Sequence, residues 1–236
     1  MADPLVLLPG LMSDARVFWP QIAELSAKTA VTVAPITQGE RIEEIASGLL
    51  DQLPKRFALA GMGLGGAVAL EILRRAPDRL SRLALIGASP LAEPPQAAAA
   101  REMLIVKVKS GRLADAMREE LDPLWLAPGP NRAAILEIAM DMADTLGPEV
   151  YIRQARALQR ARDQQAVLRK CKVPTLVMCG EVGKLNPVKR HSFMAELLPY
   201  AILRVIEGAG HLPTLEQPEA TTAAIKEWMK MPLTPA

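Results

Sequence analysis

The stretch Gly61-Met62-Gly63-Leu64-Gly65-Gly66 lies between a predicted strand at 56–60 and a predicted helix at 65–75. The predicted strand is a short run of mostly apolar residues. The predicted helix has apolar residues at helical spacing and ends at Ala76-Pro77. In parallel α/β sheets, ligands bind at the carboxyl ends of the strands, where such a turn lies. The sequence therefore places a candidate functional site at this turn.

Strands and helices alternate on both sides of the turn. Further strands are predicted at 5–8, 30–36, 83–86, 175–179 and 202–206, and further helices at 20–27, 41–53, 188–198 and 217–229. This alternation predicts an α/β fold with a mostly parallel sheet of about six strands and helices on both faces.

The region between the fourth and fifth strands shows only helical patterns. Helices are predicted there at 96–110, 113–121, 132–145 and 149–168. We expect these helices to form a cap over the strand ends. The predicted division is an α/β core made of 1–93 and 171–236, with a helical cap at 94–170.

Length and composition exclude several classes of protein. A chain of 236 residues, 50% of them hydrophobic, fits one domain with an insertion. The formal charge of +2 is spread along the chain and only 3% of residues are aromatic, which argues against a nucleic-acid partner. The apolar runs are too short to span a membrane. Cys171 and Cys179 match no disulfide or zinc pattern, and no secretory signal is visible, so we expect a cytoplasmic protein without a metal or cofactor.

Two motifs fit the glycine-rich turn. Gly61, Gly63 and Gly66 match the dinucleotide fingerprint G-x-G-x-x-G, which needs an acidic residue near the end of the next strand. That strand ends Ile86-Gly87-Ala88-Ser89, without a carboxylate, and the turn is in the third strand–helix unit rather than the first. The alternative is the nucleophile elbow G-x-S-x-G, with Gly63 at the serine position. The elbow fits the surrounding sequence better.

Four motifs resemble those of the α/β-hydrolase superfamily, in the order usual for that family. They are the oxyanion loop at Leu7–Leu11, the elbow at Gly61–Gly66, the strand before the catalytic acid at Val177–Glu181, and the histidine loop at Gly208–His211. The resemblance covers nearly the whole chain and implies the fold of a capped serine hydrolase, carboxylesterase-like, for small acyl esters or lactones. It also implies that the backbone N–H groups of Leu11 and Leu64 form the oxyanion hole.

The chain departs from the family pattern at two of three catalytic positions. Gly63 stands at the position of the nucleophilic serine, and Gly183 at the position of the catalytic acid. His211 is retained as the catalytic histidine. Glycine relieves the backbone strain of an elbow, so the loss of the serine is expected to stabilise the fold and to remove covalent catalysis.

Several other side chains are candidates for a role in the site. Glu181 is a possible substitute acid and Ser89 a possible replacement nucleophile, although Glu181 is two residues short of the family position and Ser89 has no elbow around it. The second histidine, His191, is expected to be solvated. The cap is expected to line an apolar substrate pocket through Met103, Leu124 and Trp125.

Three functions remain open from the sequence. The first is a serine-hydrolase scaffold that is inactive or weakly active as written. The second is a pseudoenzyme that binds a small ligand without turnover. The third is a hydrolase or lyase in which His211 activates water, with no covalent intermediate. Each implies a small-molecule substrate or ligand, and none predicts the oligomeric state.

Overall fold

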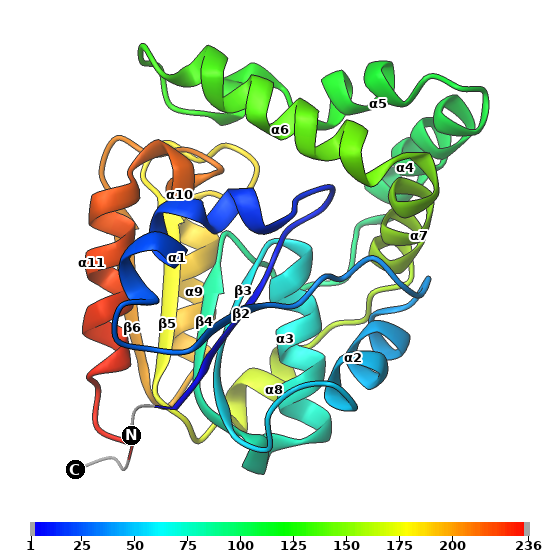
Figure 1. The fold of residues 1–236 in the computed structure, drawn as a ribbon. Coiled ribbons are helices and arrows are strands. Elements are labelled where there is room, and N and C mark those ends of the chain that lie inside the picture. Colours follow the sequence, from blue (N-terminus) through cyan, green and yellow to red (C-terminus); the bar gives the residue numbers. More distant parts are fainter. Residues whose placement is uncertain (1–2, 234–236) are drawn as a thin grey trace.

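The computed structural model describes residues 3–233 and contains a six-stranded sheet in which neighbouring strands are parallel (Figure 1). The strands are β1 (Leu5–Leu8), β2 (Val31–Val33), β3 (Phe57–Met62), β4 (Leu80–Ile86), β5 (Thr175–Gly180) and β6 (Ala201–Ile206). Their order is β2-β1-β3-β4-β5-β6, so the chain moves outward from β1 to one edge and then crosses back to β3. The predicted parallel sheet of six strands is confirmed. The reversal of direction between β1 and β3 is the place where open α/β sheets bind ligands.

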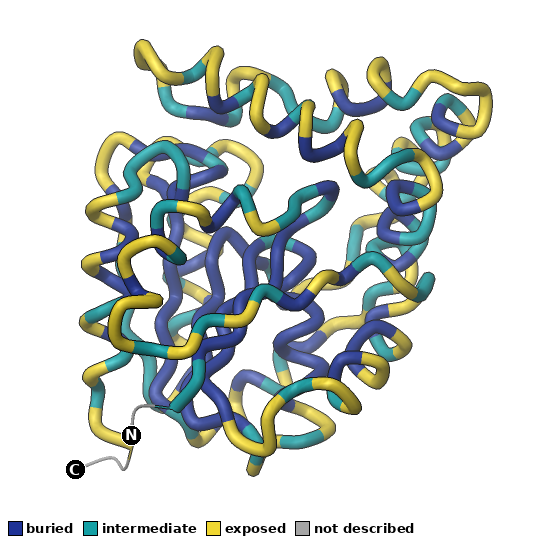
Figure 2. Tube along the Cα trace, viewed as in Figure 1, coloured by how far each residue is buried: buried dark blue, intermediate teal, exposed yellow. Residues whose placement is uncertain are grey.

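Helices cover both faces of the sheet. One face is covered by α2 (Ile42–Leu50), α3 (Leu64–Arg75), α8 (Gln165–Arg169) and α9 (Val188–Leu197), and the other by α1 (Trp19–Leu25) and α11 (Pro218–Met229). Along β1, Leu5 and Leu7 point to the second face and Val6 and Leu8 to the first, as the two-residue period of a strand requires. All residues of β3 and β4 are therefore buried (Figure 2).

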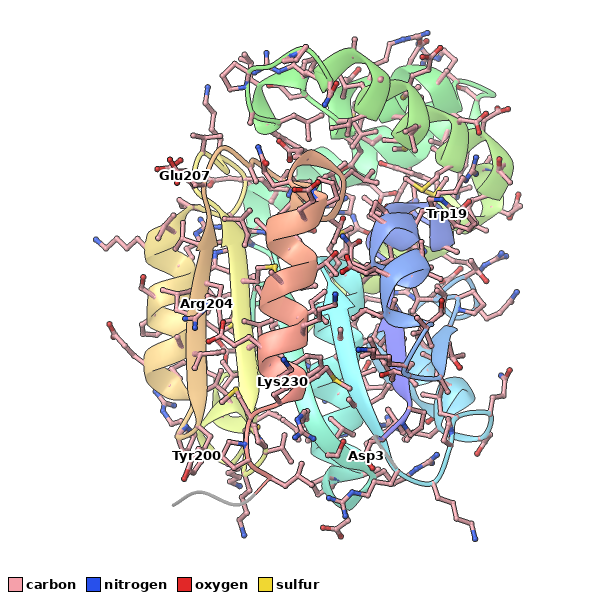
Figure 3. All side chains as sticks on the ribbon, turned by 60° about the vertical axis from the view of Figure 1, so that its left-hand side comes forward. Asp3, Trp19, Tyr200, Arg204, Glu207 and Lys230 are labelled. Atoms are coloured by element: carbon pink, nitrogen blue, oxygen red, sulfur yellow. The ribbon has the colours of Figure 1, made fainter. Side chains whose placement is uncertain are left out.

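The strand β6 forms one edge of the sheet, and most of its residues are only partly buried. Figure 3 shows Arg204 on this strand, beside α11. The Arg204 side chain forms an ion pair with Glu227 of α11. A charged side chain at this position protects an edge strand from pairing with another chain.

Four helices form a cap beyond the carboxyl ends of the strands (Figure 1). They are α4 (Pro95–Lys109), α5 (Leu113–Glu120), α6 (Arg132–Leu146) and α7 (Pro148–Gln159). They share an apolar cluster that includes Ile105, Met117, Ala143, Val150 and Tyr151. The helix α8, in contrast, contacts α3 and α9. The division into a core of 1–93 and 171–236 and a cap of 94–170 stays a prediction.

The structure divides one of the predicted helices and adds a short helix before another. The stretch predicted as one helix at 149–168 is α7 and α8, separated by 160–164. The helix predicted at 217–229 is α11, and the short helix α10 (Pro213–Glu216) precedes it. Three short 3₁₀ turns, at Ala15–Phe18, Pro77–Arg79 and Pro123–Trp125, were not predicted. None of the described helices is long and apolar enough to cross a membrane.

Candidate active site

The turn between β3 and α3 has the sharp geometry of an elbow. Gly63 has a φ of 51° and a ψ of −115°. A Cβ atom on Gly61 would lie 2.3 Å from the carbonyl oxygen of Gly65, and one on Gly66 would lie 2.4 Å from the Cβ atom of Ala88. Both positions thus require glycine because strand and helix approach so closely. A Cβ atom on Gly63, in contrast, would have only the Cα atom of Gly10, at 3.9 Å, within contact distance. A serine at position 63 therefore meets no steric clash at its Cβ atom, and the strained backbone is the one source of destabilisation.

Two backbone N–H groups beside Gly63 are free to donate. Leu64 is the first residue of α3, so its N–H group has no acceptor within the helix. Leu11 lies in the turn after β1. Among residues 3–233, neither N–H group donates a hydrogen bond to a protein atom, and both residues line the same cavity. This placement is what an oxyanion hole requires. The role of Leu11 and Leu64 stays a prediction.

His211 follows β6 and lines the cavity together with Gly63. Its backbone N–H group donates to the carbonyl oxygen of Trp125, at 2.8 Å, and the two rings pack edge to face with centroids 6.0 Å apart. Burial, with a smaller contribution from the nearby His191, lowers the pKa of His211 to about 4. The imidazole is therefore neutral at pH 7. Since a neutral imidazole can accept a proton, His211 can still act as a base.

The position predicted for the catalytic acid faces the histidine loop. A Cβ atom on Gly183 would lie 3.4 Å from the carbonyl oxygen of Gly210, the residue before His211. A Cβ atom at position 183 therefore makes only ordinary van der Waals contacts next to this loop. As written, the position provides no carboxylate for the imidazole.

The two substitute candidates have other contacts. Glu181 is exposed, and its carboxylate accepts a hydrogen bond from the N–H group of Gly208, at 3.1 Å. It does not line the cavity. Ser89 does line the cavity, and its hydroxyl accepts a hydrogen bond from the N–H group of Leu91, at 3.3 Å. Neither contact involves His211.

The structure shows a carboxylate that organises the histidine loop and that the sequence analysis missed. Glu216, in α10, accepts hydrogen bonds from the N–H groups of Gly210, at 2.8 Å, and Leu212, at 2.7 Å. These two residues flank His211. It also accepts one from the N–H group of Ala127 in the cap, at 2.7 Å. Glu216 thus ties the loop of His211 to the cap segment that carries Trp125.

A second missed residue supports the loop after β1. Met12 has a φ of 49°, the only positive φ outside glycine among the described residues. Its N–H group donates to Oε1 of Gln154, at 2.8 Å, and Nε2 of Gln154 donates to the carbonyl oxygen of Ile36, at 3.1 Å. Gln154 belongs to α7 and is fully buried. A cap residue therefore holds the strained neighbour of Leu11.

These residues surround a cavity of about 360 Å³ between the strand ends and the cap. Its wall is largely apolar and includes Leu11, Met62, Leu64, Met117, Leu121, Trp125, Leu158 and Leu212. A volume of this size is typical of small-molecule sites. Within residues 3–233 no group of three or more His, Cys, Asp or Glu side chains is arranged to hold a metal ion.

The predicted pocket lining was wrong for two of its three residues. Trp125 lines the cavity, whereas Met103 and Leu124 lie outside it, with 69% and 55% of their surface exposed. The helix α4 has apolar residues on several sides, so its sequence does not show which side faces inward. The structure turns Arg101 to the cavity and Met103 to solvent.

The prediction that His191 is solvated was also wrong. His191 is fully buried, because α9 packs on β5 and β6 and turns His191 inward, one helical turn from the buried Met194. Its Nδ1 atom is 3.3 Å from the carbonyl oxygen of Pro187, and its Nε2 atom has no hydrogen-bond partner among the described residues. Burial lowers the pKa of His191, so this ring is neutral as well.

The parallel sheet, the elbow after β3 and the histidine loop after β6 together define a capped α/β hydrolase. Residues 5–225 match the Alpha/beta hydrolase family, and the chain belongs to this family. The match supports the elbow interpretation of Gly61–Gly66 over the dinucleotide fingerprint.

Similar proteins include known esterases. The chain is 29% identical to the pimeloyl-[acyl-carrier protein] methyl ester esterase of Aromatoleum aromaticum over 203 residues. This alignment covers 80% of each protein. The fold of the present chain is similar to that of a thermophilic esterase from Thermogutta terrifontis with malate bound. The TM-score is 0.88 at 27% identity, and the match covers 96% of this chain and 89% of that chain. The enol-lactonase of Burkholderia xenovorans LB400 has a TM-score of 0.82 at 22% identity, covering 97% and 92%, and shows the same fold.

Proposed function

We propose that this protein is an esterase-type hydrolase scaffold that binds small, largely apolar acyl esters or lactones and turns them over slowly or not at all. The observation that carries the proposal is the absence of a nucleophilic side chain at Gly63. Gly63 has the backbone of a nucleophile elbow and lies beside two free N–H donors and a histidine, yet it has no hydroxyl group. A covalent acyl-enzyme cannot form on glycine.

The surroundings of His211 support the loss of covalent catalysis. In a serine hydrolase, a carboxylate orients the histidine and stabilises its charged form. Here Gly183 provides no carboxylate, and burial lowers the pKa of His211 to about 4. The ester substrates named for the relatives support an acyl ligand for the cavity, whose apolar wall would hold the acyl chain. We also propose a cytoplasmic location, since both cysteines are buried free thiols.

The double variant Gly63→Ser/Gly183→Asp tests this proposal. We expect it to hydrolyse p-nitrophenyl acetate and butyrate at least about 10³-fold faster than the parent, because removal of triad residues costs enzymes about 10⁴- to 10⁶-fold in kcat. The matched control is Gly63→Ala/Gly183→Asp, which has the same backbone strain but no hydroxyl, and it should stay inactive. A folded serine variant that hydrolyses neither ester would contradict the proposal.

One observation favours a second function. The His211 imidazole is neutral, borders the cavity and donates or accepts no side-chain hydrogen bond among the described residues. It could therefore take a proton from a water molecule in the space beside Gly63, giving direct hydrolysis. Any activity of the parent protein should then disappear in His211→Ala, and mass spectrometry should show no acyl-enzyme. Activity that survives His211→Ala rules out this second function.

A further inference from the structure

One part of the cavity wall is charged, in contrast to the apolar remainder. Glu93 lies just before α4, Arg101 lies within α4, and Glu120 is the last residue of α5. All three residues line the cavity. The helices that carry them lie together at one side of the cap in Figure 1, with α7 next to α4.

The three side chains form a buried ionic cluster with Tyr151 of α7. The guanidinium of Arg101 donates to Oε1 of Glu93 from Nη2, at 2.7 Å, and to Oε1 of Glu120 from Nη1, at 2.6 Å. The hydroxyl of Tyr151 donates to the same oxygen of Glu120, at 2.8 Å. The side chains of Glu93, Arg101 and Glu120 are only 12%, 15% and 10% exposed. The bonds to Glu93 keep Arg101 charged against the effect of burial, and its pKa is raised.

The charges of this cluster do not balance. Two carboxylates face one guanidinium, which leaves a formal charge of −1. The second carboxylate oxygen of Glu120, Oε2, has no hydrogen-bond partner among residues 3–233, although this side chain is nine-tenths buried and lines the cavity. In a largely apolar cavity an unbalanced carboxylate interacts strongly with any charge placed beside it.

Among residues 3–233, Arg101 is the one charged side chain of the cavity wall that forms an ion pair with Glu93 or Glu120. Arg190 is exposed to solvent and comes from α9, which packs on β5 and β6 rather than on the cap helices that carry the cluster. His211 is the remaining titratable residue of the wall in the described part of the chain, and it is neutral at pH 7. Arg101 donates three hydrogen bonds to Glu93, which already balances its charge, so the charge of Glu120 is left for a ligand.

We propose that the ligand of this cavity carries a cationic group, a protonated amine, that binds Glu120 in the cap. Its acyl end would then lie on the side of the cavity formed by Gly63 and the N–H groups of Leu11 and Leu64. This inference rests on the proposed function, because it names the class of ligand for the same cavity. A carboxylate at the same end of the ligand would be repelled, so the cavity discriminates against acidic esters.

Four probes that share one apolar body test the inference. They are 3-phenylpropylamine, 3-phenylpropan-1-ol, 3-phenylpropanoate and the methyl ester of the last. Their dissociation constants for the protein are measured by calorimetry at pH 7.5 and low ionic strength. We expect the amine to bind at least about tenfold more tightly than the alcohol, since hydrogen bonds to charged groups are the stronger ones, and the carboxylate to bind most weakly.

The variant Glu120→Gln keeps the shape of the cluster and removes its excess charge, so the preference for the amine should disappear. Glu137→Gln is the matched control, because Glu137 is an exposed residue of α6 that does not line the cavity, and it should keep the preference. If Glu120→Gln fails to fold, Glu93→Gln is used instead: it leaves Glu120 as the sole carboxylate partner of Arg101 and removes the excess charge of the cluster, so the preference for the amine should disappear in it as well. Equal binding of amine and alcohol while the methyl ester binds would overturn this inference and leave the proposed function intact. Failure of all four probes to bind would contradict the proposed function itself.

Discussion

Gly63 has a backbone conformation that side chains with a Cβ atom rarely adopt, with a φ of 51°. Because the space around it is open, a substitution there changes only the backbone energy. We expect Gly63→Ala to lower the free energy of unfolding by about 1–3 kcal/mol, the usual cost of such strain. Urea unfolding measures the change. Gly48→Ala is the control, since Gly48 lies inside α2 with no atom near its Cβ position, and alanine should stabilise that helix by about 0.5–1 kcal/mol. Changes of the same sign in both variants would contradict this explanation of Gly63.

His211 makes the stability of the protein depend on pH. Its pKa is lowered from an ordinary value of 6.5 to about 4 in the folded protein. Between these two values the unfolded chain binds more protons than the folded one, so the free energy of unfolding falls as the pH falls through this window. The variant His211→Gln lacks this contribution, while the buried His191 is unchanged in it. We therefore expect the Tm of His211→Gln to rise relative to that of the parent as the pH is lowered from 7.5 to 4.5. A constant difference in Tm over this range would show that the imidazole titrates normally.

At the scale of elements, α10 positions the histidine loop through one carboxylate. In Glu216→Ala the N–H groups of Gly210, Leu212 and Ala127 would lose their acceptor. We expect a loss of at least about 1–3 kcal/mol in the free energy of unfolding, the cost of leaving one buried donor without a partner. The resonances of the His211 ring and of Trp125 should shift in the same variant. Glu219→Ala removes an exposed carboxylate at the start of α11 and should change neither. Unshifted ring resonances in a destabilised Glu216→Ala would limit this residue to a structural role.

The sequence predicted most elements because their apolar periods are regular, and it failed where tertiary contacts interrupt a helix. The break between α7 and α8 is an example. The N–H group of Gln164 donates to the carbonyl oxygen of Pro90, at 2.7 Å, and its side-chain amide donates to that of Ala67, at 3.2 Å. These partners are more than 70 residues away along the chain, so no local pattern reports them. The helical spacing on both sides of the break is intact, which is why one continuous helix was expected.

In the candidate site, too, the sequence predicted the positions that follow the strands but not the side chains that the cap contributes. Leu11, Gly63, Gly183 and His211 each follow the carboxyl end of a parallel strand, so the alternation of strands and helices brings their positions to one edge of the sheet. The side chains from the cap could not be placed in this way. Which side of α4 faces the cavity depends on how the cap packs as a whole.

At the scale of the whole molecule, the cap and the core are joined by polar contacts from α7 as well as by the cavity wall. Gln154 bonds to Met12 after β1 and to Ile36 after β2. Arg153 donates to the carbonyl oxygen of Thr37, at 2.9 Å, and Met12 itself packs in the apolar cluster of the cap. The loop beside the predicted oxyanion hole is thus part of the interface between core and cap. A change in the position of the cap should therefore reach Leu11 and the cavity together.

The variant Gln154→Ala tests this coupling. It leaves the N–H group of Met12 and the carbonyl oxygen of Ile36 buried without partners, which should cost at least about 1–3 kcal/mol in the free energy of unfolding. Because Met12 has a strained φ, we also expect its loop to relax, with faster amide hydrogen exchange around Leu11 and weaker binding of an ester in the cavity. Gln159→Ala is the matched control, since Gln159 lies in the same helix but bonds to Ala98 and Glu102 within the cap. If exchange around Leu11 is as slow in Gln154→Ala as in Gln159→Ala, the loop after β1 keeps its conformation without the cap, and the two parts of the molecule are not coupled through this residue.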